Sequence, residues 1–238
     1  MAYELSSIFA SYEGSPVLEN ISLSLEPGTI TVVLGPSGCG KTTLLNLIAG
    51  LKLPDSGKRL GFDGCRFSYA FQDPRLLPWL DCRENLAFAL SGALGRKEAL
   101  LRAERFLESA GLDESSLLLP AALSGGMRRR LSLARAFAYP ADMLLLDEAF
   151  QAVDLRMKLE LMDLFLGLMR EEGRTVVCVT HDVEEAAYLA DRAIVLSPRP
   201  ARIVDAFDVE TPRSERSLGS PATMEAEARL YRLALGPS

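Results

Sequence analysis

Residues 29–43 read Thr-Ile-Thr-Val-Val-Leu-Gly-Pro-Ser-Gly-Cys-Gly-Lys-Thr-Thr, and this stretch decides the fold. Its first part, Thr29 to Leu34, is a β-branched run typical of a buried strand. A glycine-rich loop follows, and the apolar residues after it predict a helix that ends before Gly50. A strand that enters a helix through glycines gathers backbone N–H groups and the positive end of the helix dipole around one point. The sequence therefore predicts a phosphate site.

The loop fits the pattern GxxxxGK[ST] of nucleoside triphosphate sites. Lys41 adds a positive charge for the phosphates, and Thr42 offers a hydroxyl that can ligate Mg²⁺. Cys39 is interpreted as a small residue in a tight turn. We expect a nucleoside triphosphate to contact Gly35, Ser37, Gly38, Cys39, Gly40, Lys41, Thr42 and Thr43.

A second motif, Leu144-Leu145-Leu146-Asp147-Glu148, runs from apolar residues into two adjacent carboxylates at a predicted strand end. Asp147 can hold Mg²⁺ through water, and Glu148 can polarise the water that attacks the γ-phosphate. Acidic strand ends also occur as solvated caps. Together with the phosphate loop, the pair predicts hydrolysis of the nucleotide as well as its binding.

The rest of the chain alternates strands with helices. Ile21, Leu23 and Leu25 alternate as in a half-buried strand. Further buried strands are predicted at 141–149, 175–179 and 193–196, and helices around 100–110 and 155–169. This order predicts a parallel α/β sheet with the helical middle as an insertion. The tail after Pro212 is weakly amphipathic from Met224 to Leu235 and indicates no particular structure.

The composition of the chain restricts its partners and its location in the cell. The 238 residues carry 26 Lys and Arg against 32 Asp and Glu, and the net charge of −6 argues against nucleic acid or an anionic bilayer as a partner. No run reaches the roughly 18 apolar residues of a membrane span. The start, MAYELSSIFASYEG, lacks the features of a secretion signal, so a cytosolic location is expected. Four scattered cysteines predict reduced thiols.

The motifs in their order resemble the ATP-binding subunit of ABC transporters. That order is GPSGCGKT, Phe71-Gln72, Leu123-Ser124-Gly125-Gly126-Met127, LLLDE, Asp154 and Thr180-His181-Asp182. The likeness covers nearly the whole chain. The stretches 72–80 (Gln-Asp-Pro-Arg-Leu-Leu-Pro-Trp-Leu) and 191–200 are similar to the nitrate, sulfonate and taurine importer branch.

The resemblance implies an α/β fold with a RecA-like P-loop NTPase core, an antiparallel β edge and a helical insertion. The domain would be single, with its core at 1–75 and 136–212, the helical signature subdomain at 76–135 and a tail at 213–238. It also implies a homodimer in which Ser124, Gly125 and Gly126 of one copy contact the γ-phosphate held by the other. Gln72 would reach Mg²⁺ and the attacking water, His181 would contact the γ-phosphate, Asp154 would couple the two sites, and Tyr12 would stack on adenine.

The implied function is ATP hydrolysis that energises an importer of nitrate, sulfonate, taurine or a similar small solute. The implied partners are a transmembrane permease that docks near Gln72 and Trp79 and, indirectly, an extracytoplasmic solute-binding protein. The subunit would lie peripherally at the cytoplasmic face of the membrane. Three alternative functions would each require sequence features that this chain lacks. They are a soluble ATPase acting on nucleic acid or ribosomes, a P-loop kinase, and a regulatory binder that does not hydrolyse ATP.

Three departures from the family pattern stand out. Met127 stands where the family usually has Gln, and the sequence Phe150-Gln151-Ala152-Val153-Asp154 is uncommon in the family. The stretch 56–69 is shorter than usual, so we expect its strands to be short. The first two remove no phosphate or metal ligand. Arg128, Arg129 and Arg130 are interpreted as a solvated basic face of a helix.

Overall fold

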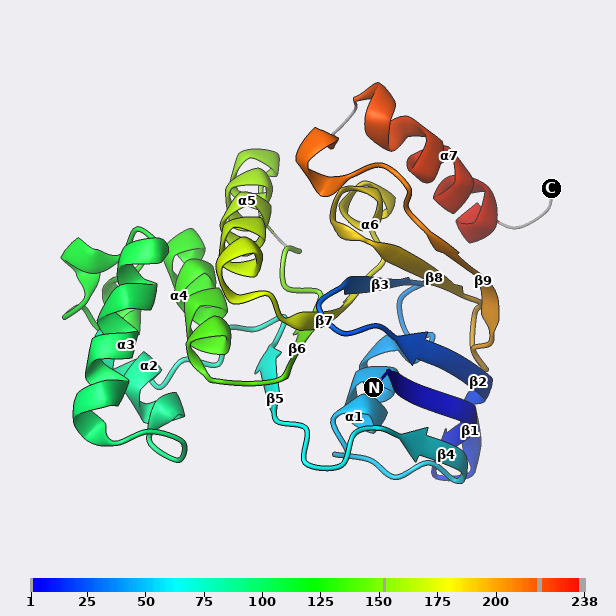
Figure 1. Ribbon diagram of the computed structural model, residues 1–238, viewed down its shortest axis with the longest axis horizontal. Helices are drawn as coiled ribbons and strands as arrows, with labels where there is room; N and C mark the ends of the chain where they lie inside the picture. Colours follow the sequence, from blue (N-terminus) through cyan, green and yellow to red (C-terminus); the bar gives the residue numbers. More distant parts are fainter. Residues whose placement is uncertain (1, 152, 218–219, 236–238) are drawn as a thin grey trace. The chain divides into compact units, whose positions relative to one another are not determined.

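The computed structural model describes residues 2–151, 153–217 and 220–235, and the chain divides into two compact units. The first unit joins the residues up to Cys65 with those from Thr175 onward, and the second runs from Arg66 to Arg174. Figure 1 traces both units in the colours of the sequence.

An antiparallel sheet forms one layer of the first unit. β1 (Tyr3–Tyr12) pairs with β2 (Ser15–Leu25) on one side and with β4 (Ser56–Leu60) on the other. The alternation predicted for β2 is present, since its apolar side chains at 21, 23 and 25 are buried. The predicted antiparallel edge is therefore confirmed, and β4 is short, with five residues.

A second layer of the first unit holds three buried strands and one half-exposed edge strand. Their order is β7 (Thr175–Thr180), β3 (Ile30–Leu34), β8 (Arg192–Leu196) and β9 (Ile203–Asp208). β3 is parallel to both of its neighbours, whereas β9 is antiparallel to β8. All residues of β3 and β7 are buried, as the unbroken apolar runs predict. Helix α1 (Lys41–Ile48) follows β3, and α6 (Val183–Leu189) follows β7.

The tail folds into a helix that the sequence did not clearly indicate. α7 (Pro221–Leu235) packs against α6 and β8, after a short 3₁₀ turn at Arg213–Glu215. The buried guanidinium of Arg216 donates to the carbonyl oxygens of Thr211, Tyr188, Ala190 and Val209. Burial lowers the pKa of Arg216. A single arginine thus fastens the segment before α7 to the end of α6.

The second unit is mainly helical. Its strands β5 (Phe67–Ala70) and β6 (Met143–Asp147) are parallel. Its helices are α2 (Cys82–Leu90), α3 (Arg96–Ser109), α4 (Gly125–Ala138) and α5 (Leu155–Glu172), with 3₁₀ turns at Asp113–Ser115 and Pro120–Ala122. Phe165 meets Phe137 and Phe150 edge to face in the core. The predicted α/β class with a helical insertion is confirmed.

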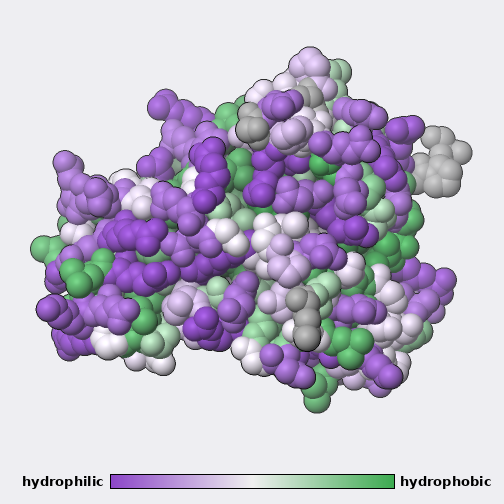
Figure 2. All heavy atoms as spheres, viewed as in Figure 1, coloured by the Kyte–Doolittle hydropathy of each residue, from purple (hydrophilic) through white to green (hydrophobic). Residues whose placement is uncertain are grey.

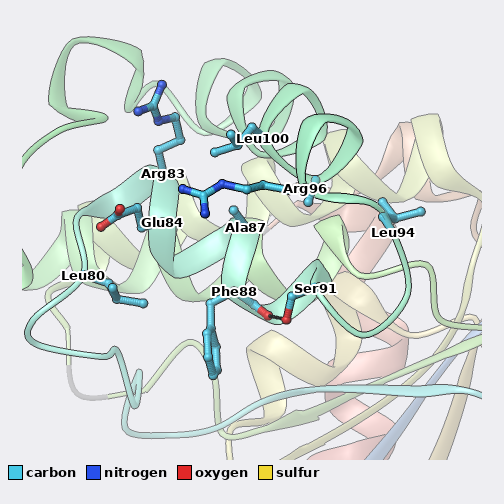
Figure 3. A pocket seen from close by; sticks show the side chains of 10 residues that line it. Leu80, Arg83, Glu84, Ala87, Phe88, Ser91, Leu94, Arg96 and Leu100 are labelled. Atoms are coloured by element: carbon cyan, nitrogen blue, oxygen red, sulfur yellow. Dashed lines mark hydrogen bonds between the residues drawn. The ribbon is translucent and has the colours of Figure 1, made fainter.

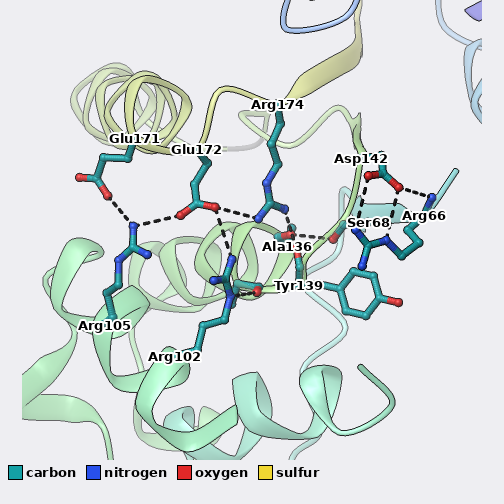
Figure 4. A network of polar contacts seen from close by, with 11 residues as sticks. Arg66, Ser68, Arg102, Arg105, Ala136, Tyr139, Asp142, Glu171, Glu172 and Arg174 are labelled. Carbon is teal, nitrogen blue, oxygen red and sulfur yellow. Dashed lines mark hydrogen bonds and ion pairs between the residues drawn. The ribbon is translucent and has the colours of Figure 1, made fainter. Parts of the chain in front are cut away.

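A polar network ties three helices of this unit together (Figure 4). Glu172 at the end of α5 pairs with Arg102 and Arg105 of α3 at 3.3 and 3.0 Å. It also pairs with the buried Arg174, which donates to the carbonyl oxygen of Tyr139 after α4. Partly buried ion pairs that are also hydrogen-bonded are costly to break on one side only. The network therefore holds α3 and α4 against the end of α5.

The surface shows no broad apolar band on the face drawn in Figure 2, where hydrophilic and hydrophobic residues are interspersed. Within the described part of the chain, no helix combines the length and the apolar character needed to span a bilayer. The four cysteines are free thiols, as the sequence predicts.

Candidate functional site: a phosphate loop, a carboxylate pair and a signature helix

The phosphate loop begins where two parallel strands end together. Leu34, the last residue of β3, pairs with Thr180, the last residue of β7. The Gly35 N–H donates to the Thr180 carbonyl oxygen at 3.3 Å. Because the carboxyl ends of parallel strands share one edge of the sheet, the loop after β3 and His181 after β7 come from adjacent strand ends.

The loop backbone adopts a shape that requires glycine at two positions. Gly38 and Gly40 have φ angles of +77° and +121°. At Gly40 a Cβ atom would also lie 2.7 Å from the Val17 Cγ1 of β2. Glycine tolerates both conditions because it has no side chain. This backbone turns N–H groups toward the start of α1, where an anion is favoured.

Lys41 occupies the centre of the loop. Its ammonium donates to the carbonyl oxygens of Gly35 at 2.9 Å and Pro36 at 3.1 Å, and the residue is only 5% exposed. The charge is thereby held inside the loop at the helix N-terminus. Thr42 is exposed, whereas Cys39 and Thr43 are buried and Ser37 is exposed at the tip. The first unit thus gathers all the predicted loop residues.

Two further predicted residues lie in the same unit. His181 is exposed directly after β7, and Asp182 next to it caps α6 by accepting from the Glu185 N–H at 3.0 Å. Tyr12 ends β1 and is 47% exposed. The ammonium of Lys52 lies 4.5 Å from the centre of the Tyr12 ring. Sequence reasoning missed Lys52, because nothing in the pattern around it marks a cation over an aromatic ring.

The carboxylate pair lies in the second unit, at the end of β6. Asp147 is its last residue, and the Tyr69 hydroxyl of β5 donates to Asp147 Oδ2 at 3.3 Å. Burial and the Asp147 charge raise the pKa of Tyr69 well above its usual value. Glu148 has a φ of +48°, a left-handed conformation that is rare without glycine. Strained backbone conformations of this kind cluster at functional positions.

The signature residues open helix α4. Ser124 is the N-cap, and its Oγ accepts from the Met127 N–H at 3.2 Å. Gly126 faces Met157 of α5 so closely that a Cβ atom there would overlap the thioether. Gly125 and Gly126 line a hollow of about 510 Å³ together with Asp154, which caps α5. The hollow brings the signature glycines and Asp154 together.

The interpretation of the three signature arginines as a solvated face is wrong. Arg128 donates to the Leu123 carbonyl oxygen, and Arg130 pairs with Glu160. Arg129 donates to the carbonyl oxygens of Gln72 and Ala149 at 3.3 and 3.4 Å. All three are half-buried, because carbonyl groups and a carboxylate of neighbouring segments surround them. Arg129 thereby ties the backbone of the exposed Gln72 to the signature helix.

A separate hollow lies between α2 and α3 (Figure 3). Its volume is about 380 Å³, and its walls combine apolar side chains with the charged groups of Arg83, Glu84 and Arg96. Trp79, before α2, is 70% exposed. Aromatic residues, Trp among them, are enriched at protein–protein interfaces.

The sequence predicts three Mg²⁺ donors: the Thr42 hydroxyl of the first unit, and the Asp147 carboxylate and Gln72 amide of the second. Oxygen donors of these kinds suit Mg²⁺, which keeps several waters and takes few protein ligands. The described residues contain no cluster of three or more His, Cys, Asp or Glu that could hold a metal ion. Each of the three predicted donors is of a kind that suits Mg²⁺ bound mainly through a nucleotide.

Comparison with known proteins decides the family. The family described as ABC transporter matches residues 18–151. This chain belongs to the ABC transporter family. It is 42% identical over 209 residues to the taurine import ATP-binding protein TauB of Escherichia coli O157:H7, covering 85% of this chain and 82% of that protein. It is 44% identical over 208 residues to the aliphatic sulfonates import ATP-binding protein SsuB 1 of Xanthomonas axonopodis pv. citri (strain 306), covering 83% and 81%.

The fold agrees with this assignment. The dimeric structure of the bacterial ABC transporter cassette MJ0796 is 30% identical with a TM-score of 0.74, covering 87% of this chain and 98% of that one. A post-hydrolysis dimer of the same cassette with ADP and phosphate is 29% identical with a TM-score of 0.71, covering 86% and 100%. The ABC subunit is thus an ATP-binding ATPase of the transport class, as the motifs predict.

Proposed function

We propose that this ABC subunit hydrolyses Mg·ATP as a homodimer and that hydrolysis energises the import of a small sulfonate such as taurine. The observation that carries the ATPase part is the phosphate loop with the Lys41 ammonium held in its centre. The sulfonate part is supported by relatives named for taurine and aliphatic sulfonate import at 42% and 44% identity.

In this proposal the first unit binds the nucleotide. Lys41 exchanges the carbonyl oxygens of Gly35 and Pro36 for the β- and γ-phosphates, and the loop N–H groups surround the same oxygens. Adenine stacks on Tyr12. His181, from the adjacent strand end, donates to the γ-phosphate.

Hydrolysis then requires a base and a charge clamp. Glu148 accepts the proton of the water that attacks the γ-phosphate in line, and Gln72 orients that water. Thr42, Asp147 and Gln72 would hold Mg²⁺, which would neutralise charge on the phosphates. Lys41 stabilises the charge that develops on the phosphate oxygens.

The second copy completes each site through its signature. Ser124 Oγ accepts from the Met127 N–H, so its own hydroxyl hydrogen can donate to a γ-phosphate oxygen. The N–H groups of Gly125 and Gly126, at the N-terminus of α4, add donors and a favourable dipole. Asp154, beside the signature glycines, couples the two sites. The dimeric structures of a related cassette support this pairing.

The permease docks on the second unit at Trp79 and the α2–α3 hollow, which offer an exposed aromatic side chain and a mixed apolar and charged wall. This keeps the subunit at the cytoplasmic face of the membrane, and a solute-binding protein acts on the far side. We assign the core to 1–75 and 136–212, the signature subdomain to 76–135 and the tail to 213–238.

Uptake by cells tests this function. The native host loses the gene and receives either the wild-type gene or its Lys41→Ala form, and import of radiolabelled taurine and short alkanesulfonates is measured. We expect the wild-type gene alone to restore uptake. Sulfonate uptake that persists without the gene would contradict the substrate class, and uptake restored by Lys41→Ala would contradict its dependence on ATP.

A further inference from the structure

Three side chains of the second unit form a stack that ends on Asp147. The Tyr69 and Phe71 rings are 4.1 Å apart with an interplanar angle of 15°. The Arg75 guanidinium lies 3.9 Å from the centre of the Phe71 ring. At the other end, the Tyr69 hydroxyl donates to Asp147 Oδ2 at 3.3 Å. We call Tyr69, Phe71 and Arg75 the Tyr69 stack.

The sheet explains why Tyr69 reaches Asp147. β5 is parallel to β6, and Tyr69 is opposite Leu145 in the register. A strand residue and the residue two positions on share one face, so Tyr69 and Phe71 project together, and Asp147 stands two positions beyond Leu145. A long side chain from Tyr69 therefore meets the carboxylate at the end of the neighbouring strand.

The far end of the stack is fixed by the backbone around it. Arg75 has a φ of +46°, uncommon for a residue with a side chain. Arg135 of α4 donates to the carbonyl oxygens of Arg75 at 2.9 Å and Pro74 at 2.7 Å. These bonds hold the Arg75 backbone to α4, the helix that begins at the signature residues. α4 thus holds the backbone from which the Arg75 side chain reaches the Phe71 ring.

We propose that Tyr69 is a positioning residue for Asp147, orienting this carboxylate toward Mg²⁺, and that Phe71 and Arg75 hold the Tyr69 ring in place. The inference rests on the proposed function in one respect, the role of Asp147 as a magnesium-binding group. A hydroxyl that donates to one carboxylate oxygen fixes the plane of the group and so the direction of the other oxygen. Outer partners of this kind tune metal affinity in many metal sites.

Tyr69→Phe tests the inference, because it keeps the stacked ring and removes only the hydroxyl. ATP binding is measured by titration calorimetry in EDTA and over a series of Mg²⁺ concentrations. Mn²⁺ affinity of the ATP complex is measured by electron paramagnetic resonance. The bond is longer than the usual 2.7–2.8 Å, so we expect Mg²⁺ and Mn²⁺ affinity to weaken by roughly three- to tenfold, which is below the roughly 10- to 100-fold loss typical when an outer partner is removed. ATP affinity in EDTA should be unchanged.

Two further variants make the test specific. Tyr231→Phe removes the hydroxyl of a tyrosine on α7 that is 45% exposed, and it should change neither metal affinity nor ATP binding. Arg75→Ala leaves the Tyr69 hydroxyl but frees one end of the stack, so it should weaken metal affinity in the same direction by a smaller factor. If Tyr69→Phe folds poorly, the metal affinity of Arg75→Ala tests the inference in its place.

Asp147→Asn separates failure of this inference from failure of the proposed function. If Asp147→Asn weakens Mg²⁺ dependence while Tyr69→Phe leaves it unchanged, the positioning role is refuted and the metal role stands. If Asp147→Asn leaves Mg²⁺ dependence unchanged, the metal role itself is refuted. Support requires that Tyr69→Phe weakens metal affinity in the native chain and adds no further loss when Asn replaces Asp147.

Discussion

Gly40→Ala tests whether the phosphate loop needs the backbone shape that the structure gives it. Gly40 has φ +121° and ψ 16°, a conformation that residues with side chains avoid. The new Cβ would lie 2.7 Å from Val17 Cγ1 and 2.9 Å from Leu18 Cδ2. Val17 is buried and β-branched, so it cannot turn away at low cost.

The magnitude follows from two contributions. An unfavourable positive φ costs about 1–2 kcal/mol for a residue with a Cβ, and an overpacked contact costs about 1–3 kcal/mol. Together they give about 2–5 kcal/mol. If the loop opens to relieve the clash, ATP affinity falls roughly 30-fold to several-thousand-fold. If the loop keeps its shape, the melting temperature falls by about 4–20 °C.

Titration calorimetry with Mg·ATP measures the loss of ATP affinity, and thermal unfolding of the same preparation measures the loss of stability. Gly38→Ala is the matched control, since it also has a positive φ, of +77°, but no heavy atom within 4 Å of its Cβ. It should lose only about 1–2 kcal/mol. A Gly40→Ala protein that binds ATP within about threefold of the native protein and melts within about 2 °C of it would refute this account of the loop.

Three other changes probe the site, the tail and the thiols. Lys41→Ala should abolish measurable ATP binding while the chain stays folded, because it removes the only charge inside the loop that we assign to the phosphates; retained binding by calorimetry would contradict the loop assignment. Arg216→Ala should lower the free energy of unfolding by about 2–4 kcal/mol, since it strips donors from several part-buried or buried carbonyl groups. The control Arg229→Ala removes the surface ion pair with Asp205 and the contact of the guanidinium with the Phe207 ring, and should cost less, about 0.5–1.5 kcal/mol; equal losses of the two variants in urea unfolding would contradict the role of Arg216 in holding the tail. Burial raises the pKa of Cys82 to about 11, so at pH 8 it stays a thiol and iodoacetamide should label the half-exposed Cys65 first; mass spectrometry that finds Cys82 modified first would show that segment to be more open than described.

Much of the fold could be predicted because local patterns and tertiary structure agree. β3, within the run 29–34, is buried on both faces, and a strand buried in this way has an unbroken apolar sequence. The sequence therefore predicts this strand correctly. The loop after this strand is also predicted by its sequence, because Gly38 and Gly40 occupy the two positions whose φ angles are positive. α5 covers the predicted helix at 155–169 and is capped by Gly173, whose φ is +61°.

Other features depend on contacts between segments far apart in sequence. Arg129 and Arg135 contact carbonyl groups of the Gln72 loop more than 50 residues away, so a run of arginines looks like a solvated face until the fold is known. Arg216 gathers its carbonyl partners from the end of α6 and the segment after β9, which explains why the tail could not be interpreted. The Tyr69 contact with Asp147 depends on strand register, which the sequence does not give.

The central claim is that two identical chains enclose the nucleotide, one through its loop and Lys41, the other through Ser124. Sedimentation or light scattering of Glu148→Gln with saturating Mg·ATP tests it most directly, because a chain that binds but cannot hydrolyse should accumulate in the closed pair. We predict twice the monomer mass of 25.9 kDa. The double variant with Ser124→Arg should bind ATP and remain a monomer. A Glu148→Gln protein that stays monomeric with its loop filled, or a double variant that still pairs, would contradict the claim.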